Sequence, residues 1–227
     1  MLLGHYGAAF AARRTAPRTS LGALTFAAQF LDQLWPILLL TGVEHVRIVP
    51  GLMAASPLDF VSYPVSHSLL TAAGWGLLLA GIYYALRRDG RGAAVLGALV
   101  VSHWLLDAPM HRPDLPLWPG SPVLVGGGAW NSVPLTILLD GGVFAAGLAL
   151  YLRGTRARDR IGSWGLYAMA AVLVFFFVSG FLAPPPSGER ELAFGALGLW
   201  LFVPWSWWVD RHRVPRHAAA RPAGLSG

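Results

Sequence analysis

The sequence predicts an all-α integral membrane protein, a bundle of about six transmembrane helices with a short half-helix at its N-terminus. Three observations predict this class. Hydrophobic residues make up 55% of the 227 residues and charged residues only 12%, whereas soluble domains carry roughly 25% charged residues. Several apolar stretches are long enough to cross about 30 Å of hydrocarbon. The basic residues lie between these stretches rather than within them.

The predicted elements follow one another as a single polytopic membrane domain over residues 1–210. Residues 2–12 are too short to span a membrane and are expected to form a half-helix that ends at Arg13. Spans are expected near residues 21–42, 66–86, 93–110, 132–152, 164–183 and 192–209. Residues 211–227 are expected to form a basic, disordered tail.

The arginines predict the orientation of these spans. The chain has no lysine, and all but three of its 17 basic residues lie before the first span, in the turns after the second and fourth spans, or in the tail. The exceptions are Arg47, Arg112 and Arg190. The positive-inside rule then places both termini in the cytoplasm, with the protein in a bacterial-type plasma (inner) membrane and the lipid bilayer as its partner. Because the arginines lie at span ends and not along one face, we expect no nucleic-acid partner.

Two long outward segments, 43–65 and 109–131, are rich in proline and glycine. Such loops often cover a functional site. Arg47 and Arg112, which lie on them, are expected either to hold a phosphate bidentately or to be ordinary solvated charges. The remaining ionisable residues here, Glu44, His45 and His111, are expected to lie at the surface or to face a substrate.

Ionisable residues inside the apolar stretches are the main functional signal. His103 and Asp107 are four residues apart, so both side chains lie on one face of a helix. The other members of the set are His5, Asp32, His67 and Asp140. Ionisable groups are costly within a membrane and usually mark function. Since the chain has no cysteine, a metal would be held by nitrogen and oxygen atoms.

The depth of these residues in the membrane allows some of them to meet. At 1.5 Å per residue, His5, Asp32 and His103 lie about 12, 16 and 15 Å from the cytoplasmic side. His67 lies near the outer end of the second span, so it joins them only if the 43–65 loop dips inward or that span starts deeper. Hydroxyl groups expected to orient the histidines belong to Ser66, Ser68 and Ser102.

Each candidate also has a structural interpretation. His103 and Asp107 would form a hydrogen-bonded pair that serves helix packing alone. His67 would be an interfacial side chain and His5 a solvated one. Asp32 would accept hydrogen bonds from backbone groups that Pro36 leaves free. Asp140 is expected either to orient a ligand or to serve in helix packing.

Four short motifs follow one another in the first half of the chain. They are Gly4-His5 before a small-residue helix, Asp32 followed by Pro36, His67-Ser68 at a helix start, and His103 with Asp107 on one helix. Their order resembles that of the predicted membrane-bound metal-dependent hydrolases of the YdjM-like, LexA-regulated group, over roughly residues 1–115. The Pro-Asp-x-Asp run of that family is Phe30-Leu31-Asp32-Gln33 here, so one carboxylate is missing.

The resemblance implies metal-assisted hydrolysis of an amphipathic, lipid-like ester or phosphoester. A divalent ion, zinc in the first place and manganese or iron as alternatives, would be held by His67, His103 and Asp107, with His5 and Asp32 closing the site or holding a second ion. The ion would lower the pKa of a bound water towards about 7. Asp32 and Asp107 would be the catalytic carboxylates, with Asp32 taking the proton.

Three other functions fit the same residues. A small transporter or proton relay would use Asp32, Asp107 and Asp140 as protonatable groups and would need no metal. A membrane haem protein would use His67 and His103 as axial ligands. A structural protein would use the buried groups for packing alone.

Overall fold

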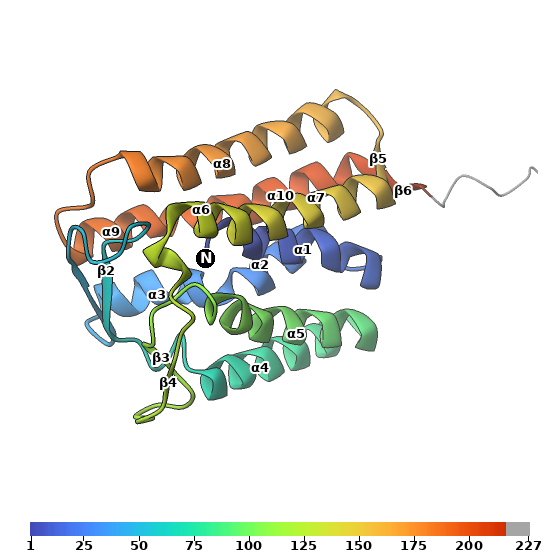
Figure 1. Cartoon of the computed structure of the whole chain (residues 1–227). Coiled ribbons are helices and arrows are strands. Elements are labelled where there is room, and N and C mark those ends of the chain that lie inside the picture. The colour runs from blue at the N-terminus through green and yellow to red at the C-terminus, as the bar shows by residue number, and fades with distance from the viewer. Residues whose placement is uncertain (217–227) are drawn as a thin grey trace, which may run out of the picture.

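The protein is described here by a computed structural model, which describes residues 1–216. Its long helices run roughly side by side as one bundle (Figure 1). The helices are α1 (Leu3–Thr15), α2 (Leu21–Ala28), α3 (Phe30–Leu40), α4 (Leu69–Arg87), α5 (Gly90–Asp107), α6 (Val133–Thr136), α7 (Gly142–Gly154), α8 (Leu166–Leu182), α9 (Glu189–Ala196) and α10 (Phe202–Arg211). The all-α fold expected from the sequence is therefore confirmed.

Short helical segments of other types join some of these helices into longer ones. The π-helical segments η2 (Ile137–Gly141) and η3 (Ile161–Gly165) lead into α7 and α8. The 3₁₀ segment η4 (Leu197–Leu201) joins α9 to α10, and η1 (Ala129–Asn131) precedes α6. The helical runs thereby reach lengths that suit a bilayer.

Within residues 1–216, four such runs are long and apolar enough to cross a membrane: Leu69–Arg87, Val133–Gly154, Ile161–Leu182 and Glu189–Arg211. A fifth is added if α2 and α3, which are bent by 53° relative to each other, form one broken span. The structure thus supports four or five spans rather than the six expected. The helix left out is α5, which carries ionisable side chains at Arg91, His103 and Asp107 and buries one face in the bundle.

Three short antiparallel strand pairs close the two ends of the bundle (Figure 1). The pairs β1 (His45–Ile48) with β2 (Leu58–Ser62) and β3 (Leu115–Pro116) with β4 (Leu124–Val125) lie at the end where α5 finishes. The pair β5 (Thr155–Ala157) with β6 (Arg213–Pro215) lies at the opposite, arginine-rich end. The disorder expected from residue 211 is therefore not found at Arg213–Pro215, and residues 217–227 lie outside the described part of the chain.

Helix α1 lies in the middle of the bundle, with the N-terminus near the centre of Figure 1. It approaches α7 very closely, because a Cβ atom on Gly147 would lie 2.0 Å from the carbonyl oxygen of Gly7. Only glycines permit this backbone contact. The half-helix expected over residues 2–12 is thus found, and its first turn is buried rather than solvated.

Candidate metal centre

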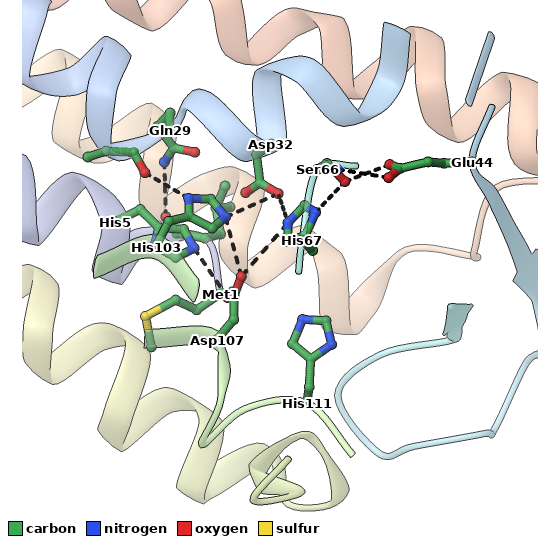
Figure 2. Close-up of polar contacts among 12 residues, drawn as sticks. Met1, His5, Gln29, Asp32, Glu44, Ser66, His67, His103, Asp107 and His111 are labelled. Carbon is green, nitrogen blue, oxygen red and sulfur yellow. Dashed lines mark hydrogen bonds and ion pairs between the residues drawn. The ribbon is translucent and has the colours of Figure 1, made fainter. Parts of the chain in front are cut away.

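The five predicted ligands lie together in the centre of the bundle (Figure 2). His5 comes from α1 and Asp32 from α3, His67 lies in the turn before α4, and His103 and Asp107 lie on the last turns of α5. All are buried except Asp32, whose side chain is 22% exposed. The 43–65 loop dips into the bundle and continues to His67, which is the first of the two routes considered above.

Four donor atoms face one another at the centre of this cluster. The Nε2 atom of His103 lies 3.3 Å from Asp107 Oδ2 and 3.6 Å from Asp32 Oδ1. The Nε2 atom of His67 lies 3.5 Å from Asp32 Oδ1 and 3.9 Å from Asp107 Oδ2. Four atoms bound tetrahedrally at 2.0–2.1 Å from a zinc ion are about 3.3 Å apart. Three of the four separations are close to this value. The ligand atoms of Asp32, His67 and His103 all lie within 4.8 Å of one another, as do those of His5, His103 and Asp107.

The tautomer of His103 is determined by the backbone. Its Nδ1 atom lies 2.7 Å from the carbonyl oxygen of Ala28, which can only accept a hydrogen bond. Nδ1 therefore carries a proton, and Nε2 is directed towards the two carboxylates. Nε2 has no hydrogen-bond partner among residues 1–216. With Nε2 unprotonated, a buried acceptor would face other acceptors, which is costly unless a cation lies between them.

A buried carboxylate orients His67 through a serine (Figure 2). The Ser66 hydroxyl donates to Glu44 Oε2 at 2.6 Å, and its oxygen lies 2.7 Å from His67 Nδ1. Because the serine proton goes to the carboxylate, the serine oxygen accepts from Nδ1. The backbone N–H groups of Val65 and Ser66 donate to the other oxygen of Glu44, at 2.7 and 2.8 Å. With Nδ1 held in this way, Nε2 of His67 points at Asp32 and Asp107, which is the orientation that a metal ligand needs.

His5 lies against the opposite side of the cluster. Its ring stacks on that of His103, with 3.6 Å between the ring centroids. Its Nε2 atom lies 3.2 Å from Asp107 Oδ1, and neither ring nitrogen makes a hydrogen bond with any described residue. The Met1 amine contacts the same carboxylate oxygen. Asp107 thus directs one oxygen to His67 and His103, and the other to His5.

Asp140 anchors the helix that carries His5. It lies in the π-helical segment η2, is buried, and accepts hydrogen bonds from the backbone N–H groups of Leu2 and Gly4 at 2.9 and 2.5 Å. A carboxylate at the N-terminus of a helix satisfies free N–H groups and interacts favourably with the helix dipole. Asp140 therefore positions a candidate ligand.

A cavity of about 240 Å³ reaches the cluster. Its polar lining includes Asp32, His67 and Asp107, with His111 and Asp140, and the apolar remainder is lined mainly by aromatic and aliphatic side chains from the two outer segments and α8. The side chain of Asp32 is more exposed than that of Asp107. A substrate in this cavity would therefore meet Asp32.

A family model described as YdjM inner membrane protein matches residues 1–183. The chain belongs to this family. The matched segment includes all five ligand candidates. Neither a curated protein nor a solved structure matches the chain. The family and the apolar helices together identify an integral membrane protein.

In this YdjM-family chain, two residues that were expected at the surface or facing a substrate lie close to the candidate ligands. Glu44 is fully buried and holds Ser66. His111 is also buried and lines the cavity, where its ring packs on Trp130 with 4.2 Å between centroids. Burial lowers the pKa of His111 below its usual value, although Asp114 opposes this effect. The sequence offers no local signal for either residue, because both lie in irregular loops.

Local contacts decide the remaining predictions that the sequence made for polar residues. Of the three serines, only Ser66 orients a histidine: Ser68 accepts from the N–H of Thr71 at the start of α4, and Ser102 donates to Leu99 O within α5. Asp32 faces His67 and His103, so it does not serve the backbone near Pro36. The haem interpretation does not fit, because carboxylates lie within 3.9 Å of both imidazoles and leave no space for a porphyrin.

The two outer-loop arginines bind a carboxylate of the protein itself. Arg47 Nε donates to Asp59 Oδ2 at 2.9 Å, and Arg112 contacts the other oxygen of Asp59. Desolvation opposes ionisation, but hydrogen bonds and charges from both arginines hold the pKa of Asp59 below its usual value. As far as the described residues show, neither arginine lines the central cavity. Their role is to join the two outer segments above the site rather than to hold a phosphate.

Proposed function

We propose that this YdjM-family protein is an integral-membrane metal-dependent hydrolase of an amphipathic ester or phosphoester. The observation that carries the proposal is the convergence of potential ligand atoms from α3, α5 and the turn before α4. Two are imidazole nitrogens whose other nitrogens are held by Ala28 and Ser66. Two are carboxylate oxygens of Asp32 and Asp107. Such a set needs a cation to be stable in a buried place.

Each residue is assigned one role. His67, His103 and Asp107 hold the ion, which is the three-ligand pattern of catalytic zinc sites. A bound zinc ion would acidify a water molecule and polarise the oxygen of the substrate. Asp32 faces the cavity and is the more exposed carboxylate, so it accepts the proton of the attacking water. His5 supports the site from behind through its stacking on His103.

The proposed location is the plasma (inner) membrane with both termini in the cytoplasm. The arginine-rich turns and the β5–β6 pair share one end of the bundle, and the loops that cover the cavity share the other (Figure 1). Under the positive-inside rule the arginine-rich end is cytoplasmic. The cavity then lies towards the outer half of the membrane.

The first test is the metal content of the detergent-purified protein, measured by elemental analysis. The wild type should hold about one zinc, manganese or iron ion per chain, and His103→Ala and Asp107→Ala should hold none. Ser102→Ala is the matched control, since its hydroxyl bonds within its own helix. A metal-free wild type after reconstitution, with the fold intact, would overturn the proposal and favour the proton relay or a structural role.

The second test is hydrolysis of chromogenic amphiphilic esters and phosphoesters by the metal-loaded protein. Asp32→Asn should retain the metal and lose turnover, because it removes the proton acceptor while leaving the three ligands. Full activity of Asp32→Asn would contradict the role given to Asp32.

A further inference from the structure

The apolar part of the central cavity lies against α8. Phe176, Phe177, Gly180 and Phe181 of this helix line the cavity, together with Ala196 and Leu199 from the following helical run. The polar lining, which includes Asp32, His67 and Asp107, belongs to the same space. A ligand that fills the cavity therefore places a polar group at the candidate metal centre and an apolar group against α8.

The opening of the cavity is on the side that faces lipid. Among the described residues of its lining, Phe176 and Gly180 are the exposed ones, and they lie four residues apart on one face of α8. Helix α8 belongs to the candidate span Ile161–Leu182, and its neighbours Phe175 and Leu182 are highly exposed. Exposed apolar side chains of this size on a spanning helix contact hydrocarbon. The cavity thus opens sideways to the bilayer.

Gly180 leaves room at this opening. A Cβ atom at position 180 would meet no atom of the described residues within 4 Å. Gly180 also lines a neighbouring hollow of about 670 Å³, formed with Ala55, Leu58 and Phe181 beneath the outer loop. Both hollows share these residues. The two hollows therefore adjoin each other at Leu58, Gly180 and Phe181.

The size of the central cavity limits what it can hold. Its volume of about 240 Å³ lies below the roughly 300–1,000 Å³ of sites that enclose a whole drug-sized ligand. A lipid-like molecule would fit only with its reacting group inside and its chain continuing through the opening. A polar substrate that entered from water would make no apolar contact with the aromatic side chains of α8.

We infer that the opening at Phe176 and Gly180 is a lateral entrance for the hydrocarbon chain of the substrate, and that Gly180 determines which chains fit. The chemistry of this step rests on the proposed function, and the substrate class is that of linear-chain amphiphiles taken from the bilayer. The binding of the hydrocarbon chain rests on the cavity alone. A larger side chain at position 180 would project into the path that the chain follows.

The decisive variant is Gly180→Leu, and its matched control is Gly74→Leu. Gly74 lies on α4, is exposed, and likewise has no described atom within 4 Å of its Cβ position. With chromogenic esters of 2 to 12 carbons, the wild type should prefer long chains. Gly180→Leu should reduce kcat/KM for the longest ester about 10-fold while leaving the shortest ester unchanged, because the chain loses its place in an apolar pocket. The control should match the wild type.

A binding measurement separates this inference from the hydrolase proposal. A 12-carbon alkyl phosphocholine with a terminal diazirine is photolysed with the protein, and labelled residues are mapped by mass spectrometry. Trp130, which lines the central cavity and not the neighbouring hollow, should be labelled in the wild type and in Gly74→Leu, and should be protected in Gly180→Leu. Labelling confined to the outer faces of α4 and α8 would overturn the inference, whether or not any ester is hydrolysed. If the residues are labelled as expected but no ester is hydrolysed, the result supports the lateral entrance and contradicts the proposed hydrolase function.

Discussion

Two buried carboxylate clusters lie at opposite ends of α1, and their partners differ in kind. At the arginine-rich end, Asp210 accepts hydrogen bonds from Arg13 Nε at 3.2 Å, the Tyr151 hydroxyl at 2.9 Å and the Leu21 N–H at 3.1 Å. All of its partners are donors. At the other end, Asp107 and Asp32 face imidazole nitrogens.

The difference separates a structural ion pair from a ligand site. A carboxylate surrounded by donors is satisfied without any further group, so Asp210 fastens α1, α7 and α10 together. Asp107 also accepts from the Met1 amine, but its other oxygen and Asp32 face imidazole nitrogens, an arrangement that the proposed metal ion would complete. Asp107 and Asp210 are both buried, and the kind of partner distinguishes the two clusters.

The largest expected effect comes from removing a ligand charge. Asp107→Asn should lower the affinity for zinc by about 1,000-fold, because a structural set of ligands shares roughly 10–16 kcal/mol of binding free energy. Competition with a chromophoric chelator measures this affinity. Asp210→Asn, the equivalent change in the other cluster, should leave the affinity unchanged. Equal losses in both variants would remove the distinction between the clusters.

The next effect concerns stability rather than metal binding. Asp210→Ala should lower the free energy of unfolding by about 3 kcal/mol, because it leaves the Arg13 charge without its buried partner. Thermal unfolding in detergent measures it. Added chelator should lower the melting temperature of the wild type and of Asp210→Ala by similar amounts and should not affect His103→Ala, since only bound metal stabilises the folded state. A chelator-insensitive wild type would contradict the metal centre.

A smaller effect is expected for the group that orients His67. Ser66→Ala should lower zinc affinity by about 10- to 100-fold, as for other residues that hold a metal ligand through a hydrogen bond. Ser66→Thr should restore it, because the hydroxyl is kept. Ser68→Ala, which removes the cap of α4, should reduce stability and not affinity. If Ser68→Ala lost zinc affinity to the same extent as Ser66→Ala, Ser66 would act by stabilising the fold and not by orienting His67.

The smallest effect is pH-dependent and lies in the loops above the site. The pKa of Asp59 is depressed, so its ion pairs stabilise the fold above the ordinary carboxyl pKa of about 4 and are lost as pH falls below it. Arg47 is largely exposed, so we expect less than about 1 kcal/mol. Asp59→Asn should be less stable than the wild type at pH 7, and the difference should vanish at pH 3. A difference that persists at pH 3 would mean that Asp59 acts through packing.

The membrane helices and all five ligand candidates were predictable from local patterns. An ionisable residue stands out in an apolar stretch, as Asp32 does, and the spacing of His103 and Asp107 places both on one helix face. The number of spans was less predictable, because α5 combines an apolar stretch with the ionisable residues Arg91, His103 and Asp107. The strand pairing of Arg213–Pro215 was missed since its partner lies in a distant turn.

The sequence by itself determined the fold class, the arginine asymmetry between the two ends, and which side chains are available as ligands. These properties depend on hydropathy and on spacings within one helix. The tertiary structure alone shows that Glu44 holds Ser66, that Asp140 anchors α1, and that α8 lines the central cavity. These contacts join segments 22 or 136 residues apart, or helices whose faces meet only in the bundle. No periodicity or local propensity encodes them, because they arise from the packing of the whole chain.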